Sequence, residues 1–351
     1  MKTWQKIKAQ PELLAKYLVR EKVIDTIRTF FKSQGFTEVF TPILVPTPSA
    51  EANLEVFETE LRTSLGQKRR AFLIMSPEYA IKKLLAAGIG SCFEITRAFR
   101  NEEEVSCMHN PEFTILEWYR VGADYKKVMV DFEKLFVEII KKCNGDVDLK
   151  KWIYQGEEYD LRLPWMKISV AEAFKKYVGI ETETLLSRQK LLGVAREKGY
   201  QINSKTSWEQ IFYQLFFNEI EPKLKESHKP VFIYDYPLAQ AALARKKPED
   251  PRFAERFEIF LAGLELGNCF SELKEAEEQK ERLEADLALR KIEGKTKFPV
   301  DEDFIMALKS GLPEVAGIAV GVDRLVVLAA NAKRIEETLF FPAGELFELE
   351  K

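Results

Sequence analysis

The sequence has only two histidines, His109 and His228, and only four cysteines, none of which forms a Cys-x-x-Cys pair. Structural zinc sites use both residue types at short spacings, so we expect no structural zinc. The sequence also has no apolar run long enough to span a membrane, and no signal peptide opens the chain. These absences predict a cytoplasmic protein with reduced thiols and no membrane partner.

A basic excess is missing as well. The chain has 53 Lys and Arg against 56 Asp and Glu, for a net charge of −3. A positive field over the whole molecule is therefore excluded, although a local basic patch is not. The 351 residues are 46% apolar and 31% charged, which is typical of a globular protein with a large core, built as one large domain or two ordinary ones.

Apolar periodicity predicts an α+β fold. Helices are expected over 17–34, 77–87, 124–143, 206–227 and 272–293, and strands over 36–42, 71–75 and 231–236. Residues 256–267 are typical of two short strands about an Ala262-Gly263 turn, and AGIAVGVDRLVVL is typical of a strand that leads into a helix. Strands early, helices in the middle and strands late predict an antiparallel sheet flanked by helices.

The stretch RAFRNEEEVSCMHNPEFTILEWY, residues 97–119, places a charged loop between two apolar strands. Such a loop is costly unless a ligand or partner meets its charges. Arg100 offers a planar fork of donors that suits carboxylate or phosphate, and Glu102 is expected on the same strand face. The loop therefore predicts a site for an anion beside a group that needs an acceptor.

Three stretches resemble the three motifs of class II aminoacyl-tRNA synthetases. The helix and strand ending at Pro42 resemble motif 1, FRNEEEVSCMHNPEFTILEWY resembles motif 2 of the lysyl enzymes, and GIAVGVDRLVVL resembles motif 3. ERFEIFLAGLELGNCFSEL and LPEVAGIAVGVDRL are similar to the lysyl subgroup in particular. The resemblance covers nearly the whole chain. It implies the class II catalytic fold and a single lysyl-type catalytic domain over residues 1–351.

Within the lysyl subgroup the chain resembles the elongation factor P–(R)-β-lysine ligases. TWQ, SPEY at 76–79 and HNPEFTILEWYR match that family, and Ala319 stands where tRNA-charging enzymes have glycine. About 16 residues precede the motif 1 helix, too few for the OB-fold that binds the anticodon, so no anticodon recognition is expected. The family activates a lysine-like amino acid with ATP and transfers it to a lysine of elongation factor P.

Two alternatives stay open. The first is a shortened lysyl-tRNA synthetase relative that uses α-lysine and a tRNA or another acceptor. The second is a non-catalytic paralogue that binds nucleotide or a partner. By resemblance we also expect a homodimer formed through motif 1.

Adenylate formation requires a carboxylate to attack the α-phosphate of ATP, so the site must bring two anions together. Arg100 is predicted to bridge them, and Arg324 is predicted to lie along the phosphates or stack on adenine. Phe113 is expected to stack under adenine. Further predicted ATP-binding residues, several of them from the resemblance alone, are Asn101, Glu102, His109, Asn110, Glu265, Leu266 and Gly321.

Glu258, Glu265 and Glu272 are seven residues apart, twice. Paired carboxylates on neighbouring strands are costly unless a cation lies between them, so Glu258 and Glu265 are predicted to hold Mg²⁺. Glu272 is assigned to the side-chain amine of the substrate. Without the family resemblance, a solvent-facing helix or strand would explain the spacing better, and we assign Glu281 and Glu284 to such a face.

The remaining substrate-binding residues follow from the resemblance. Glu78 is expected to pair the second amine, and Tyr119 to bond an amine through its hydroxyl. Ser76, Pro77, Asn268, Gly317 and Ala319 complete the predicted pocket, while Trp118 is expected in the core.

Two positions, Cys269 and Met108, depart from the family pattern. Cys269 replaces a glycine, either as a thiol beside the substrate or as a small buried apolar residue. Met108 stands where a basic residue is usual, after the acidic Glu103 and Glu104.

Overall fold

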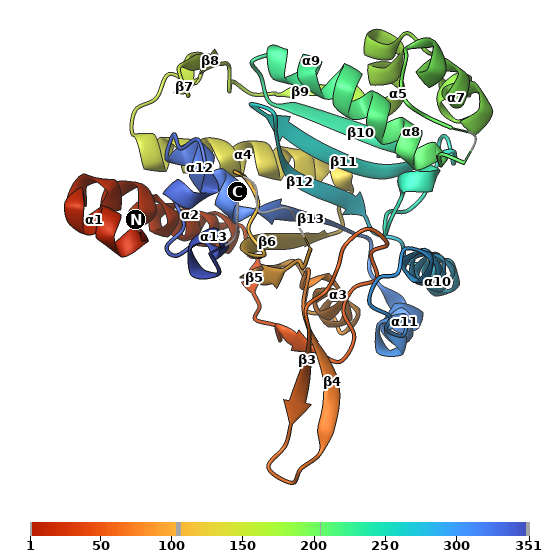
Figure 1. Cartoon of the computed structure of the whole chain (residues 1–351), viewed down its shortest axis with the longest axis horizontal. Helices are drawn as coiled ribbons and strands as arrows, with labels where there is room; N and C mark the ends of the chain where they lie inside the picture. The colour runs from red at the N-terminus through yellow and green to blue at the C-terminus, as the bar shows by residue number, and fades with distance from the viewer. Residues whose placement is uncertain (1, 103–106, 204, 349–351) are drawn as a thin grey trace. The chain divides into compact units, whose positions relative to one another are not determined.

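The computed structural model describes residues 2–102, 107–203 and 205–348 (Figure 1). The chain divides into two compact units, which we describe one at a time. The first comprises Met1–Ala123, Lys134–Val147 and Leu273–Lys351, and the second comprises Asp124–Glu133 and Asp148–Glu272. Helix α4 (Tyr125–Asn144) begins in the second unit and ends in the first. No helix among the described residues is both long enough and apolar enough to cross a membrane.

The first unit contains the three segments that resemble class II motifs 1, 2 and 3. Its further elements are α1 (Thr3–Ala9), α2 (Leu14–Ser33), β1 (Thr37–Glu38), β2 (Leu44–Val45), β3 (Glu58–Arg62), β4 (Lys68–Leu73), α3 (Glu78–Ala86), β5 (Cys92–Phe99), β6 (Glu112–Val121), α10 (Ala276–Ile292), α11 (Glu302–Gly311), β13 (Val315–Gly321), α12 (Val322–Ala329) and α13 (Ala343–Leu346). Short 3₁₀ turns lie at Pro11–Leu13 and Ile335–Glu337.

Strands β1, β5, β6 and β13 lie side by side in that order. β5 and β13 both run antiparallel to β6, whereas β1 pairs with β5 in parallel over two residues. Helix α2 covers this sheet through Phe31, whose ring lies 5.1 Å from Phe93 and 4.9 Å from Trp118. Trp118 is fully buried, which confirms its predicted place in the core.

A small separate sheet in the order β2-β4-β3 belongs to the same unit. All of β3 is exposed, and the hairpin that it forms with β4 extends away from the rest of the unit (Figure 1). In the same unit, helix α11 packs against both α3 and α10. The strand predicted over 71–75 overlaps the end of β4, whereas β3 was not predicted because it buries no residue and so lacks an alternating pattern.

The second unit is built on strands β12, β11, β10 and β9 in that order. Its elements, besides the start of α4, are β7 (Trp152–Tyr154), β8 (Glu157–Tyr159), β9 (Met166–Ser169), α5 (Val170–Ala173), α6 (Thr182–Leu185), α7 (Arg188–Glu197), α8 (Trp208–Leu215), α9 (Glu221–Glu226), β10 (Val231–Pro237), β11 (Phe253–Leu261) and β12 (Leu264–Ser271), with π turns at Phe174–Val178 and Phe216–Ile220 and a 3₁₀ turn at Leu238–Gln240. A cluster that includes Phe174, Phe212 and Phe216 joins its helices to β9 and β10.

The predicted α+β class is confirmed, with three corrections in detail. The two outer pairs, β1–β5 and β9–β10, are parallel rather than antiparallel. The strand predicted over 36–42 is short because Thr41 turns away, giving its N–H and hydroxyl to the Glu94 carboxylate. The helix predicted over 206–227 widens into a π turn at Phe216–Ile220, just before Pro222, which has no N–H to continue the ladder.

Candidate active site

Arg100 and Phe113 come together in the first unit. Arg100 follows β5, and its backbone N–H donates to the Pro111 carbonyl at 2.9 Å, which closes the loop between β5 and β6 at its base. The guanidinium lies 5.1 Å above the Phe113 ring, near the start of β6. This places a permanent cation over the face of an aromatic ring and brings together two of the residues predicted for the nucleotide site.

His109 and Arg324 form a second pair. Arg324 lies in the first turn of α12, and its Nη2 is 2.9 Å from Nε2 of His109. Arginine has no acceptor atom, so Nε2 of His109 is the acceptor in this bond and carries no proton. The structure therefore joins two residues that are 215 positions apart in the sequence.

Asp323, which the sequence reasoning missed, ties these pairs to α2. Its Oδ2 accepts the Thr114 N–H at 2.7 Å, and its Oδ1 accepts from Arg20. Arg20 also donates to Oγ1 of Thr114 at 3.1 Å. Asp323 and Thr114 directly adjoin Arg324 and Phe113, so this buried network fixes the spacing between the helix and the strand that carry them.

Ser76 and Tyr119 converge on Glu117, another residue that the sequence reasoning missed. Oγ of Ser76 donates to one carboxylate oxygen of Glu117 at 2.5 Å, and the Tyr119 hydroxyl donates to the other at 2.9 Å. Oγ of Ser76 also accepts the Glu78 N–H at 3.0 Å. The signal was available: Glu117 and Tyr119 are two apart on a strand and must share a face.

Glu117 is 1% exposed. Burial, and next the negative charge of Glu78, raise its pKa to about 8, although the hydrogen bonds from Ser76 and Tyr119 favour the ionised form. A carboxyl group in this state is poised to ionise when a cation arrives.

Glu78, at the start of α3, is paired with Lys82 one turn later at 2.5 Å. Lys82 is 1% exposed and lies over the Phe304 ring at 5.9 Å. If Glu78 also pairs with a substrate amine, as predicted, its carboxylate must bind two cations, the Lys82 ammonium and the substrate ammonium. Pro77 is the residue before the first turn of this helix.

The other predicted ATP residues of this unit lie around the same loop. Glu102 does not share the strand face of Arg100, because it lies beyond the end of β5 with a positive φ of 54°. Nδ2 of Asn110 donates to the Glu112 carbonyl at 2.6 Å, and its Oδ1 accepts the Ala343 N–H at 2.9 Å. The Asn110 amide therefore organises the loop. Glu103 and Glu104 lie outside the described residues.

Three small residues of β13 were predicted to line the pocket. Gly317 lies opposite Tyr119 and Ala319 opposite Glu117 in the strand register, so both share a face with their partners on β6. A Cβ at Gly321 would lie 3.8 Å from the Arg324 side chain, an ordinary contact, so packing within the protein does not demand glycine there. Met108 packs against the buried cluster that contains Val327.

In the second unit, Arg256 organises the predicted acidic cluster. Its guanidinium donates to Glu258 at 2.6 Å, to the side-chain oxygen of Asn268 at 3.1 Å and to the Gln240 carbonyl at 2.5 Å. The Tyr236 hydroxyl donates to the second oxygen of Glu258 at 2.7 Å. Arg256, which the sequence reasoning also missed, is buried and forms an ion pair with the buried Glu258.

A β-bulge brings the two predicted metal ligands to one face. Glu258 pairs with Asn268, and Phe260 pairs with Glu265, with a register shift between Ile259 and Phe260. Since Glu258 and Phe260 share a face of β11, Glu265 and Asn268 share it too, although they are three positions apart in the sequence. The side chain of the intervening Leu266 is buried.

Glu258 and Glu265 fit Mg²⁺ as two carboxylate oxygen donors on one face. Among the described residues, no group of three or more His, Cys, Asp or Glu could hold a metal by itself. A magnesium ion would therefore need phosphate or water oxygens in addition to these carboxylates.

Glu272 is 2% exposed and forms an isolated bridge with Ala244 just after β12. Cys269 is fully buried, and burial, then the charge of Glu272, raise the pKa of its thiol well above the usual value. It alternates with Asn268 along β12 and so lies on the opposite face. Cys269 therefore acts as a small buried residue. The exposure of Glu281 and Glu284 on α10 confirms their assignment to solvent.

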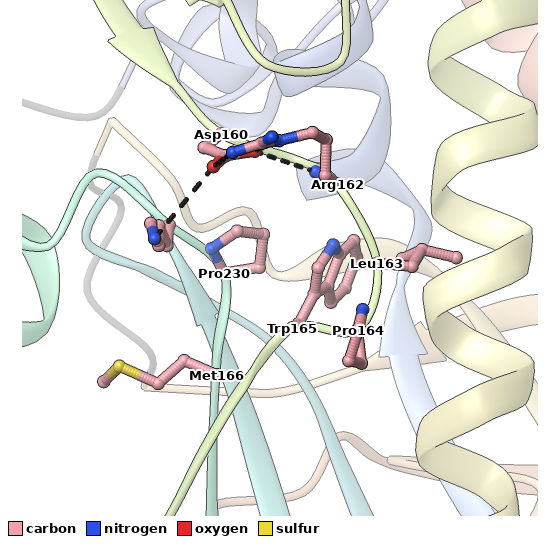
Figure 2. Close-up of a pocket in the computed structure, with 8 residues that line it drawn as sticks. Asp160, Arg162, Leu163, Pro164, Trp165, Met166 and Pro230 are labelled. Atoms are coloured by element: carbon pink, nitrogen blue, oxygen red, sulfur yellow. Dashed lines mark hydrogen bonds and ion pairs between the residues drawn. The ribbon is translucent and has the colours of Figure 1, made fainter.

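A cavity of about 400 Å³ elsewhere in the second unit contains none of the predicted site residues (Figure 2). Asp160 at its edge accepts two bonds from the Arg162 guanidinium, at 2.9 and 2.7 Å, and these bonds lower its pKa to about 2. Lys229 lies 4.0 Å from the same carboxylate. The carboxylate of Asp160 is therefore already paired and unsuited to proton transfer.

Comparison with known proteins gives a consistent family. Residues 2–345 match the tRNA synthetases class II (D, K and N). The chain is 37% identical over 332 residues to a lysine–tRNA ligase of Campylobacter jejuni, covering 95% of this chain and 64% of that protein. It is 38% identical over 334 residues to an elongation factor P–(R)-β-lysine ligase of Mannheimia succiniciproducens, covering 95% of this chain and 96% of that one.

Proposed function

Because the chain belongs to the class II tRNA synthetases (D, K and N), we propose that it is an ATP-dependent ligase that activates a lysine-like amino acid, forming pyrophosphate and AMP. The observation that carries this proposal is the buried carboxyl group of Glu117, held by Ser76 and Tyr119. A buried acid beside polar hydroxyls suits an ammonium group. In the same unit, Arg100 and Arg324 supply fixed positive charge for phosphates.

In the first step, an oxygen of the substrate carboxylate attacks the α-phosphorus and the bond to the pyrophosphate oxygen breaks. Arg100 would hold the carboxylate against the α-phosphate, since its fork can reach both anions. Phe113 would support adenine, and Arg324, oriented by His109, would hold the nucleotide. Glu258 and Glu265 of the second unit would hold Mg²⁺, which would supply positive charge for phosphate oxygens.

In the second step, the nitrogen of an acceptor amine attacks the acyl carbon, AMP leaves, and the nitrogen loses a proton. We propose (R)-β-lysine as the amino acid and a lysine side chain of elongation factor P as the acceptor. In support, the chain matches the elongation factor P ligase of M. succiniciproducens over 96% of that protein. The methyl group of Ala319 also lies directly across from Glu117, where it would alter which isomer fits.

A second candidate is α-lysine with tRNA as the acceptor, favoured by the lysine–tRNA ligases that match at similar identity. The chain spans 64% of the C. jejuni protein's length. For either candidate we propose a homodimer. In support, Phe40 and Ile43, which flank the end of the motif 1 segment, are 76% and 40% exposed.

Transfer of the activated amino acid separates the two candidates. We expect radiolabelled (R)-β-lysine to become covalently attached to purified elongation factor P in the presence of ATP, and α-lysine to be attached poorly. The matched control is elongation factor P with its acceptor lysine replaced by arginine, which should stay unlabelled. Labelling of tRNA in place of the protein would contradict the elongation factor P proposal and support the second candidate.

A further inference from the structure

Arg290, near the end of α10, is a guanidinium buried to 1% exposure. It donates to the Glu51 carbonyl at 2.8 Å, to the Thr296 carbonyl at 3.1 and 3.2 Å, and to the Leu54 carbonyl. It also lies 4.9 Å above the Phe298 ring and 3.3 Å from the Glu55 carboxylate. One side chain thus gathers the inward-facing carbonyls of the turn 51–55.

Glu55 is the anionic partner in this arrangement and is 7% exposed. One carboxylate oxygen accepts the Val56 N–H at 2.8 Å, and the other accepts the Thr296 N–H at 3.0 Å. Burial acts to raise the pKa of Glu55, but these hydrogen bonds and the charge of Arg290 outweigh it, so the pKa is lowered. The carboxylate is therefore ionised at neutral pH and holds the turn from inside.

The start of the β5–β6 loop is hydrogen-bonded to the same turn. The Asn101 N–H donates to the Glu55 carbonyl at 2.9 Å, and the two residues form an isolated antiparallel bridge. The Asn101 side chain reaches the Val56 carbonyl at 3.5 Å. Arg100 is thus held on two sides, by its own bond to Pro111 and by the attachment of the next residue to Glu55.

We propose that Arg290 and Glu55 are positioning residues that set the backbone, and so the guanidinium, of Arg100 for adenylate formation. This inference rests on the proposed function. A buried ion pair adds little net stability compared with apolar residues of similar volume, so its clearest effect here is to fix the shape of the turn. A displacement of about 1 Å at a reacting group can cost about 10²-fold in rate.

The test uses Glu55→Gln and Arg290→Lys, with Glu58→Gln as the matched control. Glu58 lies three residues further along, exposed, in an ion pair with Arg70 at 2.6 Å. Glutamine at position 55 keeps an acceptor for the Val56 N–H but loses the charge. We expect Glu55→Gln to lower kcat of ATP–pyrophosphate exchange by about 10- to 100-fold with KM for ATP little changed, and Glu58→Gln to behave as wild type.

A purely structural role would lower the melting temperature and leave kcat of the folded enzyme unchanged, and that result would overturn the inference. Amide hydrogen exchange of the peptide spanning Arg100 and Asn101 is a readout independent of activity. We expect faster exchange there in both variants and unchanged exchange in the control. If wild type shows no ATP–pyrophosphate exchange, the proposed function fails, while protected amides in both variants would still refute the positioning role.

Discussion

Arg100→Ala is expected to lower ATP–pyrophosphate exchange by about 10³-fold, since it removes the group that contacts both anions as charge develops on the phosphorus. The loss should appear in kcat if Arg100 has the proposed role of contacting both anions. The fold should persist, because the Arg100 backbone bond to Pro111 is kept and its side chain, which lies over Phe113, is only half-buried.

Arg97→Ala is the matched control for this experiment. Arg97 lies three residues earlier, on β5; its side chain is 48% exposed and lies 3.5 Å from the Glu112 carboxylate. Its removal should leave exchange within about twofold of wild type. Exchange by Arg100→Ala at the level of this control would show that Arg100 does not touch the reacting groups.

Glu117→Gln is expected to raise KM for the lysine-like substrate by about 10²-fold while leaving KM for ATP nearly unchanged, because a charge-assisted bond to a buried ammonium is lost. Glutamine has the same shape and can still accept from Tyr119, so the pocket should survive. Glu112→Gln, an exposed change on the same strand, is the control. Equal losses for ATP and for the amino acid would place Glu117 outside the amine site.

The raised pKa of Glu117 adds a pH dependence whose direction is fixed. Folding favours the protonated acid, so the native state binds this proton more tightly than the unfolded chain does. Stability from this group is therefore lost as the pH rises from about 4.5 to about 8. Denaturant unfolding should show this decline in wild type and a flatter profile in Glu117→Gln. A wild-type profile as flat as the variant's would contradict the raised pKa.

The motif residues could be picked out because each lies near the boundary of an apolar element: Arg100 follows β5, Phe113 lies near the start of β6, and Arg324 lies in the first turn of α12. Their partners were harder to predict. Asp323 and Arg256 are charged residues inside apolar runs, and nothing in a single sequence shows which distant group neutralises a buried charge. Arg256 does stand two residues before Glu258 on a strand, which places both on one face.

The acidic residues of the second unit show a different limit. The seven-residue spacing between Glu258 and Glu265 does not by itself show whether the two side chains lie on the same face of the sheet. The β-bulge beside Ile259 determines that. Glu102 was misplaced for a related reason: β5 ends at Phe99, so alternation no longer applies beyond Arg100. Lys82, by contrast, lies one helical turn after Glu78 and could have been paired with it from spacing alone.

The most direct test of the central claim is ATP–pyrophosphate exchange by the purified protein with (R)-β-lysine, α-lysine and norleucine, which lacks the side-chain amine. We expect exchange that depends on a second amine, strongest with (R)-β-lysine and absent with norleucine. No exchange with any lysine isomer, or equal exchange with norleucine, would contradict the claim that this chain activates a lysine-like amino acid.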